Sequence, residues 1–136
     1  MAEVGVAFGQ PNPSPRRAIL WTSAQQYFSL LRPFGVFPWA FIDGSFTTEK
    51  EEPGDIDVVL ATEVQASLAI GHLQNGNAMR LLNVPEVHEH FGVHVYTAFL
   101  PDDTYYVDLF QTFKPEEALA RGLPKSATRG ILKVAL

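Results

Sequence analysis

Two aspartates stand one residue apart at the start of an apolar run, and this pattern limits how the chain can fold. Asp55 and Asp57 flank Ile56, and the apolar residues 58–60 follow. Such a run is typical of a buried strand, in which side chains two residues apart point to the same face. The two carboxylates would then lie side by side and repel each other. Because burying such a pair is costly without a cation between the charges, the pattern favours a divalent metal site.

The same residues also allow a purely structural interpretation. Asp55 can cap the turn after Pro53 and Gly54, and Asp57 can face solvent on a half-exposed strand. Asp-x-Asp is common in loops, so the spacing alone does not decide between the two interpretations. The decision depends on the surrounding residues.

Proline and glycine positions, together with hydrophobic periodicity, predict one domain with an extended N-terminal arm. We expect the arm at 1–18, because residues 9–17 hold three prolines at every second position. The domain at 19–136 is predicted to contain a helix from a cap at Thr22 or Ser23 to Arg32, strands at 39–43 and 55–60, a helix beginning near Thr62, a short helix at 85–90, strands at 93–99 and 105–110, and a last strand at 130–134. This order indicates an α/β or α+β fold with helices packed on a sheet.

Composition narrows the classes of function. The 136 residues are enough for one domain that buries roughly two-thirds of its unfolded surface. The chain has no cysteine, which excludes disulfides, thiol catalysis and cysteine zinc sites. Its net charge of −5 argues against a surface for double-stranded DNA. No apolar run approaches the length of a membrane span and the start does not resemble a signal peptide, so we expect a cytoplasmic protein that does not bind membranes.

A glycine-serine pair precedes the two aspartates. Gly44 and Ser45 directly follow the predicted buried strand at 39–43. Glycine lets the backbone approach a ligand closely, and the serine hydroxyl and neighbouring N–H groups can bind phosphate oxygens. This pair alone is a weak signal, but together with Asp55 and Asp57 it favours a phosphate-containing ligand.

A third carboxylate lies in another apolar segment. Asp108 stands within the predicted strand at 105–110, where an unpaired charge would be costly. If that strand lies beside the strand of Asp55 and Asp57, three carboxylates converge, and they could hold one or two Mg²⁺ ions against a triphosphate. We expect His88, His90 and His94 at the surface or at a helix end, because neighbouring residues on a short helix point apart.

The order of these motifs resembles the signature of the polymerase-β-like nucleotidyltransferase superfamily, which is hydrophobic-Gly-Ser, a spacer and Asp-hydrophobic-Asp. Here it reads FIDGSF at 41–46, a spacer that ends at Gly54, and DIDV at 55–58. More closely, residues 39–136 are similar to a family of small uncharacterised bacterial and phage-type proteins with the nucleotidyltransferase fold. The matching segments are DGSFTTEKEEPGDIDVV, FGVHVYTAF, YVDLFQ and RGILKVAL.

The resemblance implies a minimal nucleotidyltransferase domain, in which helices flank a mixed sheet. In active members the Gly-Ser turn holds the triphosphate, and the Asp pair and a third acidic residue bind two Mg²⁺ ions. By matching position, Gly44 and Ser45 would bind the nucleotide, and Asp55, Asp57 and Asp108 would be the catalytic metal ligands. The reaction would move a nucleoside monophosphate from a nucleoside triphosphate to a hydroxyl group.

Two basic residues and the acceptor complete these expectations. Lys50 can reach a phosphate as a mobile cation or can pair with neighbouring glutamates. Close relatives more often carry lysine where this chain has Arg129, which would keep the charge for the nucleotide with a different geometry. The sequence does not identify the acceptor, for which a protein and an RNA are candidates. The alternatives are a catalytically silent interaction module, antitoxin-like or regulatory, that binds a partner protein, and a structural domain in which the aspartates only shape a loop.

Overall fold

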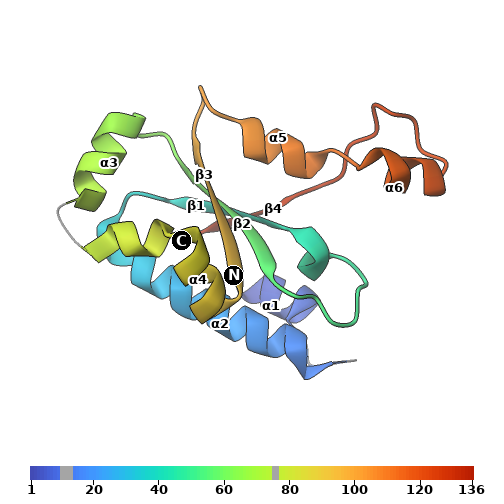
Figure 1. Cartoon of the computed structure of the whole chain (residues 1–136), viewed down its shortest axis with the longest axis horizontal. Coiled ribbons are helices and arrows are strands. Elements are labelled where there is room, and N and C mark those ends of the chain that lie inside the picture. The colour runs from blue at the N-terminus through green and yellow to red at the C-terminus, as the bar shows by residue number, and fades with distance from the viewer. Residues whose placement is uncertain (10–13, 75–76) are drawn as a thin grey trace.

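A four-stranded sheet in the order β3-β2-β1-β4 forms the centre of the molecule (Figure 1). The computed structural model describes residues 1–9, 14–74 and 77–136. The strands are β1 (Trp39–Asp43), β2 (Ile56–Thr62), β3 (Val93–Phe99) and β4 (Leu132–Ala135). The helices are α1 (Ala2–Phe8), α2 (Pro15–Leu31), α3 (Ala66–Gln74), α4 (Val84–Phe91), α5 (Tyr105–Gln111) and α6 (Pro115–Ala120), with short 3₁₀ helices η1 (Arg32–Phe34), η2 (Gly44–Thr47) and η3 (Asn77–Leu82).

Strand directions make this a mixed sheet. β1 is antiparallel to both β2 and β4, whereas β2 and β3 are parallel. A parallel pair needs a long crossover connection, and α3, η3 and α4 supply it here. The predicted fold class, an α+β domain with helices packed on a mixed sheet, is therefore confirmed.

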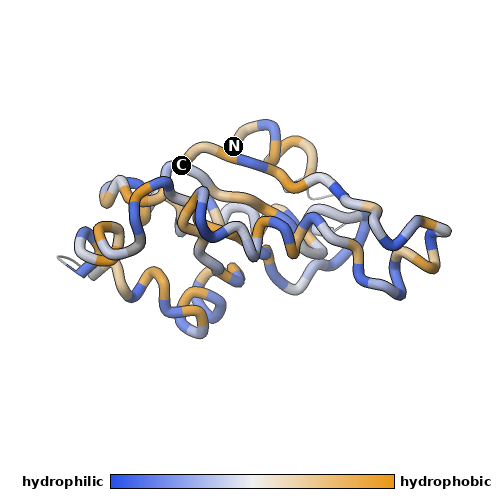
Figure 2. Tube along the Cα trace, turned by 90° about the horizontal axis from the view of Figure 1, so that it is seen from above, coloured by the Kyte–Doolittle hydropathy of each residue, from blue (hydrophilic) through white to orange (hydrophobic). Residues whose placement is uncertain are grey.

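The two faces of the sheet are covered differently. On one face, α1, α2 and α4 close the larger part of the core around fully buried side chains such as Tyr27, Phe28 and Phe46. On the other face a smaller cluster, which includes Phe41 and Val59, packs beneath α5. Viewed from above, α6 and its flanking loops extend away from the body of the molecule, as Figure 2 shows. The second face is partly open, because Asp57, His94 and Tyr96 on it are only half-buried.

The extended N-terminal arm predicted for residues 1–18 is wrong where the structure describes it. Residues 2–8 form α1, which buries Val4, and α2 begins at Pro15 instead of after Thr22. Ser14 caps α2 because its hydroxyl accepts a hydrogen bond from the Arg16 amide, and proline suits the first helical position. Residues 10–13, which carry two of the three prolines, lie outside the described residues.

The strand predicted at 105–110 is also wrong, because this segment is the helix α5. Val107 is buried, and Tyr106 and Phe110 pack against the same cluster at helical spacing. Tyr105 and Leu109 on the opposite side of the helix are exposed. The aromatic and β-branched residues of this segment favour a strand, but here they pack as one side of a helix against the sheet.

The remaining predicted elements are confirmed with shifted ends. Strands occur at β1, β2, β3 and β4, and the short helix expected at 85–90 is α4. The helix expected near residue 62 begins at Ala66, and the loop after β1 contains η2, which the sequence did not predict. Within the described parts of the chain, no helix is both long enough and apolar enough to cross a membrane.

Candidate functional site

A row of polar side chains crosses three neighbouring strands at one level of the sheet. The register pairs Asp43 at the end of β1 with Asp57 near the start of β2, and Asp57 in turn with His94 on β3. Side chains at paired positions lie on the same face. The row therefore lies on the partly open face, beside η2.

η2 brings the backbone of Gly44 against one of these carboxylates. Gly44 has a φ of +79°, and a Cβ built on it would lie 1.9 Å from Oδ2 of Asp57. Only glycine avoids both the left-handed strain and the collision. Phe46 fixes the position of η2 because its ring is fully buried and stacks on Trp21, with ring centroids 6.1 Å apart. The glycine of the Gly-Ser pair thus places the turn beside Asp57.

Asp57 is in an environment that disfavours its negative charge. The pKa of its carboxyl is raised to about 6, mainly by burial and also by the nearby charges of Asp55 and Asp43, while His94 and Arg129 partly oppose this shift. A carboxyl with this pKa, surrounded by like charges, gains from any added cation. An added cation would therefore offset part of the cost of ionising Asp57 beside Asp55 and Asp43.

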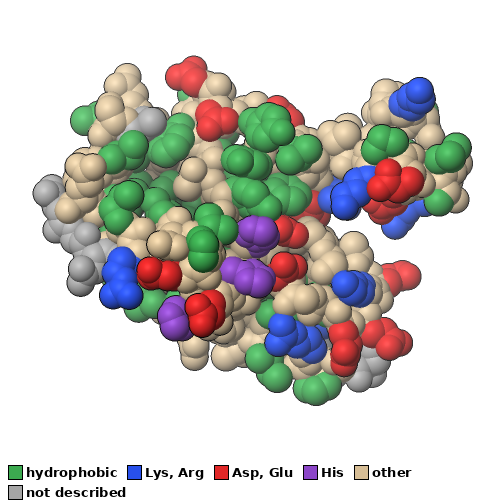
Figure 3. Space-filling model, viewed as in Figure 1, with side chains coloured by type: hydrophobic (Ala, Val, Ile, Leu, Met, Phe, Trp, Pro, Cys, Tyr) green, Lys and Arg blue, Asp and Glu red, His purple; other side chains and the backbone are tan. Residues whose placement is uncertain are grey.

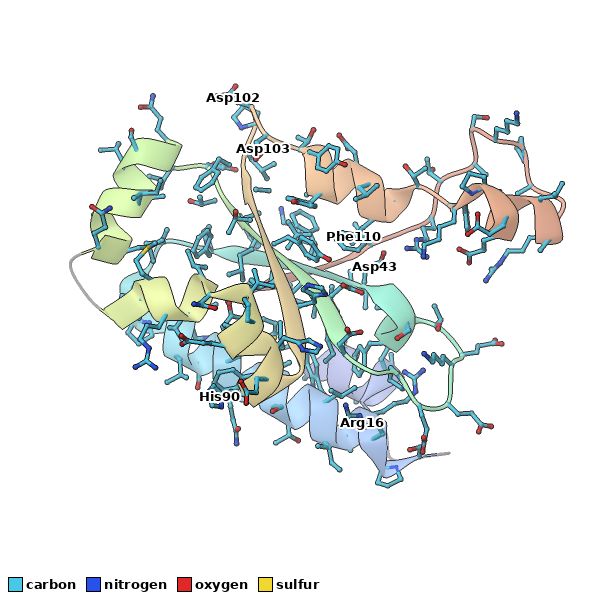
Figure 4. The ribbon with its side chains drawn as sticks, in the orientation of Figure 1. Arg16, Asp43, His90, Asp102, Asp103 and Phe110 are labelled. Carbon is cyan, nitrogen blue, oxygen red and sulfur yellow. The ribbon has the colours of Figure 1, made fainter. Side chains whose placement is uncertain are left out.

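Asp43 is compensated by an arginine from the end of the chain. Its side chain is almost fully buried, and burial raises the pKa of its carboxyl while Arg129 opposes that shift. Nη2 of Arg129 donates to Oδ2 of Asp43 at 2.7 Å, and Nε donates to the carbonyl of Phe110 at 2.8 Å. Figure 4 shows Asp43 and Phe110 close together at this end of the sheet. The structure thus brings Arg129 to the site, but much of its hydrogen-bonding capacity is already used.

Two histidines flank the site, and the sequence did not predict this. His88 on α4 approaches Asp55, with Nε2 and Oδ2 3.5 Å apart, and the rings of His88 and His94 are 5.6 Å apart. Figure 3 shows histidine side chains beside acidic ones near the middle of this face. His90 makes no such approach among the described residues and lies at the outer side of α4 (Figure 4). His94 reaches the site because β3 pairs with β2, and the residues around the histidines gave no sign of this pairing.

Asp108 does not join the other carboxylates. It lies on the exposed side of α5, where its Oδ2 accepts a hydrogen bond of 2.6 Å from the Thr104 hydroxyl. The strands beside Asp57 are β1 and β3, and β3 carries His94 and Tyr96 on the face of the site. The expectation that Asp108 is the third member of the cluster is therefore wrong, because its segment is a helix.

Of the two other residues that the sequence predicts to bind the nucleotide, Ser45 lies in the turn beside Asp57, whereas Lys50 lies in the loop that follows the turn. Ser45 lies half-buried in η2, beside Gly44, and its carbonyl accepts hydrogen bonds from the amide and the hydroxyl of Thr48. Lys50 is exposed in the loop after η2, and its carbonyl accepts a hydrogen bond from Arg17. Among the residues that the structure describes, the Lys50 ammonium group makes no ion pair.

A cavity of about 350 Å³ opens beside Asp43, between η2 and α6. Two arginines of its wall lie over the ring of Phe113, with the guanidinium carbons of Arg121 and Arg129 5.7 and 6.0 Å from the ring centroid. Its lining consists of Asp43, Thr47, Thr48, Glu49, Phe113, Glu117, Arg121, Arg129 and Gly130. The cavity is large enough for part of a nucleotide and adjoins the turn that would hold phosphate.

The donor set can be compared with what Mg²⁺ requires. In residues 1–9, 14–74 and 77–136, no three His, Asp or Glu side chains are gathered closely enough to hold a metal ion by themselves. Mg²⁺ in nucleotide enzymes usually takes one or two carboxylates and completes its shell with phosphates and water. Asp55 and Asp57, with the unfavourable charge of Asp57, fit that mode of binding.

The fold and the site define a small α+β protein with an acidic cluster at the end of an antiparallel strand pair. The chain belongs to DUF6932, a family of unknown function, whose family model matches residues 1–135. No curated protein matches the chain, and no solved structure does.

Proposed function

We propose that the protein is an Mg²⁺-dependent nucleotidyltransferase. It would move a nucleoside monophosphate from a nucleoside triphosphate to a hydroxyl group on a protein, an RNA or a small molecule, and it would act in the cytoplasm, where triphosphates are abundant. The observation that supports this proposal most is the contact of Gly44 with the Asp57 carboxylate, beside Asp55. If η2 binds phosphate, an Mg²⁺ ion held by Asp55 and Asp57 would lie next to that phosphate.

Each part of the site has a role in this proposal. The Ser45 hydroxyl and the N–H groups of η2 would bind phosphate oxygens, and the adjoining cavity would receive the rest of the nucleotide. Asp55 and Asp57 would hold one or two Mg²⁺ ions. When bound, Mg²⁺ neutralises phosphate charge and makes the α-phosphorus a better electrophile.

Arg129 has a modified role compared with the expectation from sequence. Because Nη2 and Nε are already bonded to Asp43 and Phe110, it would reach phosphate only with its remaining N–H groups. Its main effect would be to neutralise Asp43, so that two carboxylates, not three, carry the negative charge that a cation needs. The acidic residue that resembles a third ligand in sequence, Asp108, has no part in the proposal.

Mg²⁺ and nucleotide binding can be tested by thermal unfolding. The protein is heated with Mg²⁺ and each of the four ribonucleoside triphosphates, and the midpoint is compared with that of the free protein. Binding raises the midpoint, because stability grows as RT ln(1 + [L]/Kd). We expect a shift in the wild type and in Asp108→Asn, and none in Asp55→Asn or Asp57→Asn. Equal shifts in the wild type and the three variants would show that Asp55 and Asp57 do not take part in binding.

A silent interaction module is the second candidate. It is favoured by the absence of Asp108 from the site and by the exposed apolar side chains of the α6 segment, among them Leu119, which is 82% exposed. In that case the fold would bind a partner protein through the α6 extension. The absence of any Mg²⁺-dependent nucleotide shift would favour this candidate over the enzyme.

A further inference from the structure

Two consecutive arginines, Arg16 and Arg17, both reach the loop that joins the two halves of the site. They lie in the first turn of α2, far in sequence from residues 46–54. This loop begins next to Ser45 and ends next to Asp55. A pair of neighbouring arginines is usually solvated on the surface. Here both guanidinium groups instead donate hydrogen bonds to backbone carbonyls of the loop.

Arg17 holds the first part of the loop. Its side chain is only 6% exposed, and its guanidinium donates to the carbonyls of Phe46 at 2.6 Å and of Thr48 at 2.6 Å. It also donates to the carbonyls of Lys50 and of Phe8 at the end of α1. No carboxylate pairs with it in the described parts of the chain, so this buried charge is compensated there mainly by backbone carbonyls.

Phe46 connects Arg17 to the turn itself. The guanidinium carbon of Arg17 lies 5.7 Å from the centroid of the Phe46 ring, and the rings of Trp21 and Phe8 also lie beside that ring. Because Phe46 is the residue after Ser45, any movement of Arg17 would be transmitted to η2. Arg17 therefore fixes the Gly44–Ser45 side of the site.

Arg16 holds the last part of the same loop. Its Nη2 donates to the carbonyl of Gly54 at 2.7 Å, and its Nε donates to that of Pro53 at 3.4 Å. Figure 4 shows Arg16 at the beginning of α2, beside the loop that leads into β2. The bonded carbonyl of Gly54 directly precedes Asp55. Next to Arg16, the Ser14 hydroxyl donates to Glu52 at 3.3 Å. Arg16 therefore fixes the Asp55 side.

We infer that Arg16 and Arg17 are positioning residues that hold the two ends of the loop at 46–54, so that the Gly44–Ser45 turn and Asp55 stay opposite each other. This inference rests on the proposed function for the ligand that the site takes. A guanidinium has several N–H donors in a fixed plane, so one arginine can bind two or three carbonyls at once. Lysine, with one ammonium centre, cannot reproduce these contacts.

The main test variant is Arg16→Ala, because Arg16 is exposed and its loss should leave the protein folded. Arg32→Ala is the matched control, since Arg32 is exposed at the other end of α2 and the variant removes the same charge. Arg17→Lys keeps the charge but loses the multiple contacts. Circular dichroism and urea unfolding establish that each variant is folded.

Amide hydrogen exchange measures how readily the backbone opens at each end of the loop. The amide of Thr48 donates to Ser45 at 3.3 Å, and that of Ile56 donates to Gly92 at 2.9 Å. We expect about tenfold faster exchange at Ile56 in Arg16→Ala and at Thr48 in Arg17→Lys, as the loss of a charged hydrogen bond implies. Arg32→Ala should match the wild type. Uniformly faster exchange, with α4 affected as much as the loop, would mean that the arginines only stabilise the fold and would overturn the inference.

Nucleotide affinity supplies the second readout. We expect Arg16→Ala to weaken binding of the Mg²⁺–triphosphate about tenfold, while Arg32→Ala binds as the wild type does. If wild type binds and Arg16→Ala binds equally well, the inference fails and the proposed function stands. If the wild type binds no triphosphate, the proposed function fails, and the exchange rates alone decide whether the arginines position the loop.

Discussion

Replacing Gly44 with alanine tests the contact on which the site depends. The new Cβ would lie 1.9 Å from Oδ2 of Asp57, and the φ of +79° is strained for any residue with a side chain. The left-handed conformation costs about 1–2 kcal/mol. Moving the Asp57 side chain into another rotamer costs about 0.5–1.5 kcal/mol more. We therefore expect Gly44→Ala to lower the free energy of unfolding by about 1.5–3.5 kcal/mol, measured by urea denaturation.

Gly35→Ala is the control for this variant. Gly35 also has a positive φ, +62°, but no atom lies within 4 Å of a Cβ built there. It should show only the backbone cost, so the difference between the two variants isolates the collision with Asp57. In the background of Asp57→Ala, Gly44→Ala should cost less than it does in the wild type, because the carboxylate is gone and only the Cβ of residue 57, at 3.2 Å, still crowds the new methyl group. The reasoning would be refuted if the two glycine variants were equally destabilised in the wild-type background.

Two further predictions concern the charges of the site. Because the pKa of Asp57 is raised from 3.8 to about 6 in the folded protein, the folded state binds a proton more tightly and stability falls as pH rises between about 4 and 6. Asp57→Asn removes that loss, so we expect its free energy of unfolding in urea to exceed that of the wild type by about 1–2 kcal/mol at pH 7. Near pH 3.5 the two proteins should be equally stable. An advantage that does not change with pH would contradict the assignment. Arg129→Ala leaves Asp43 buried without its partner and should cost about 3–5 kcal/mol, much of it recovered when Asp43→Asn is added. Equal stability of the single and double variants would show that the pair does not compensate a buried charge.

The sequence predicted the strands of the site well, because their apolar runs are bounded by proline and glycine. β1 ends at Asp43 and β2 begins at Ile56, close to the expected ends. Gly44 also lies against Asp57, because the local pattern places a tight turn at the end of β1 and β1 pairs with β2. The local sequence predicts this part of the structure correctly because the turn and the pairing of β1 with β2 favour the same arrangement.

The sequence did not predict the partners that come from distant segments. The tyrosine, valine and phenylalanine residues around Asp108 favour a strand, but packing against Tyr96 selects a helix for that segment. The buried position of Arg17 had no local signal either. Its hydrogen bonds to the carbonyls of Phe46, Thr48 and Lys50 become visible only when α2 and the loop are placed side by side. Ser14 followed by Pro15 was a usable signal for the start of α2, obscured by the neighbouring prolines.

Transfer of label from a nucleoside triphosphate tests nucleotidyl transfer most directly. The protein is incubated with Mg²⁺, triphosphates labelled on the α- or γ-phosphate, and a pool of acceptors that includes the protein itself and total RNA. We predict that α-label enters an acceptor with release of pyrophosphate, in the wild type and in Asp108→Asn, and that Asp57→Asn abolishes both. Incorporation of γ-label, or pyrophosphate release by Asp57→Asn at the rate of the wild type, would contradict the proposed function.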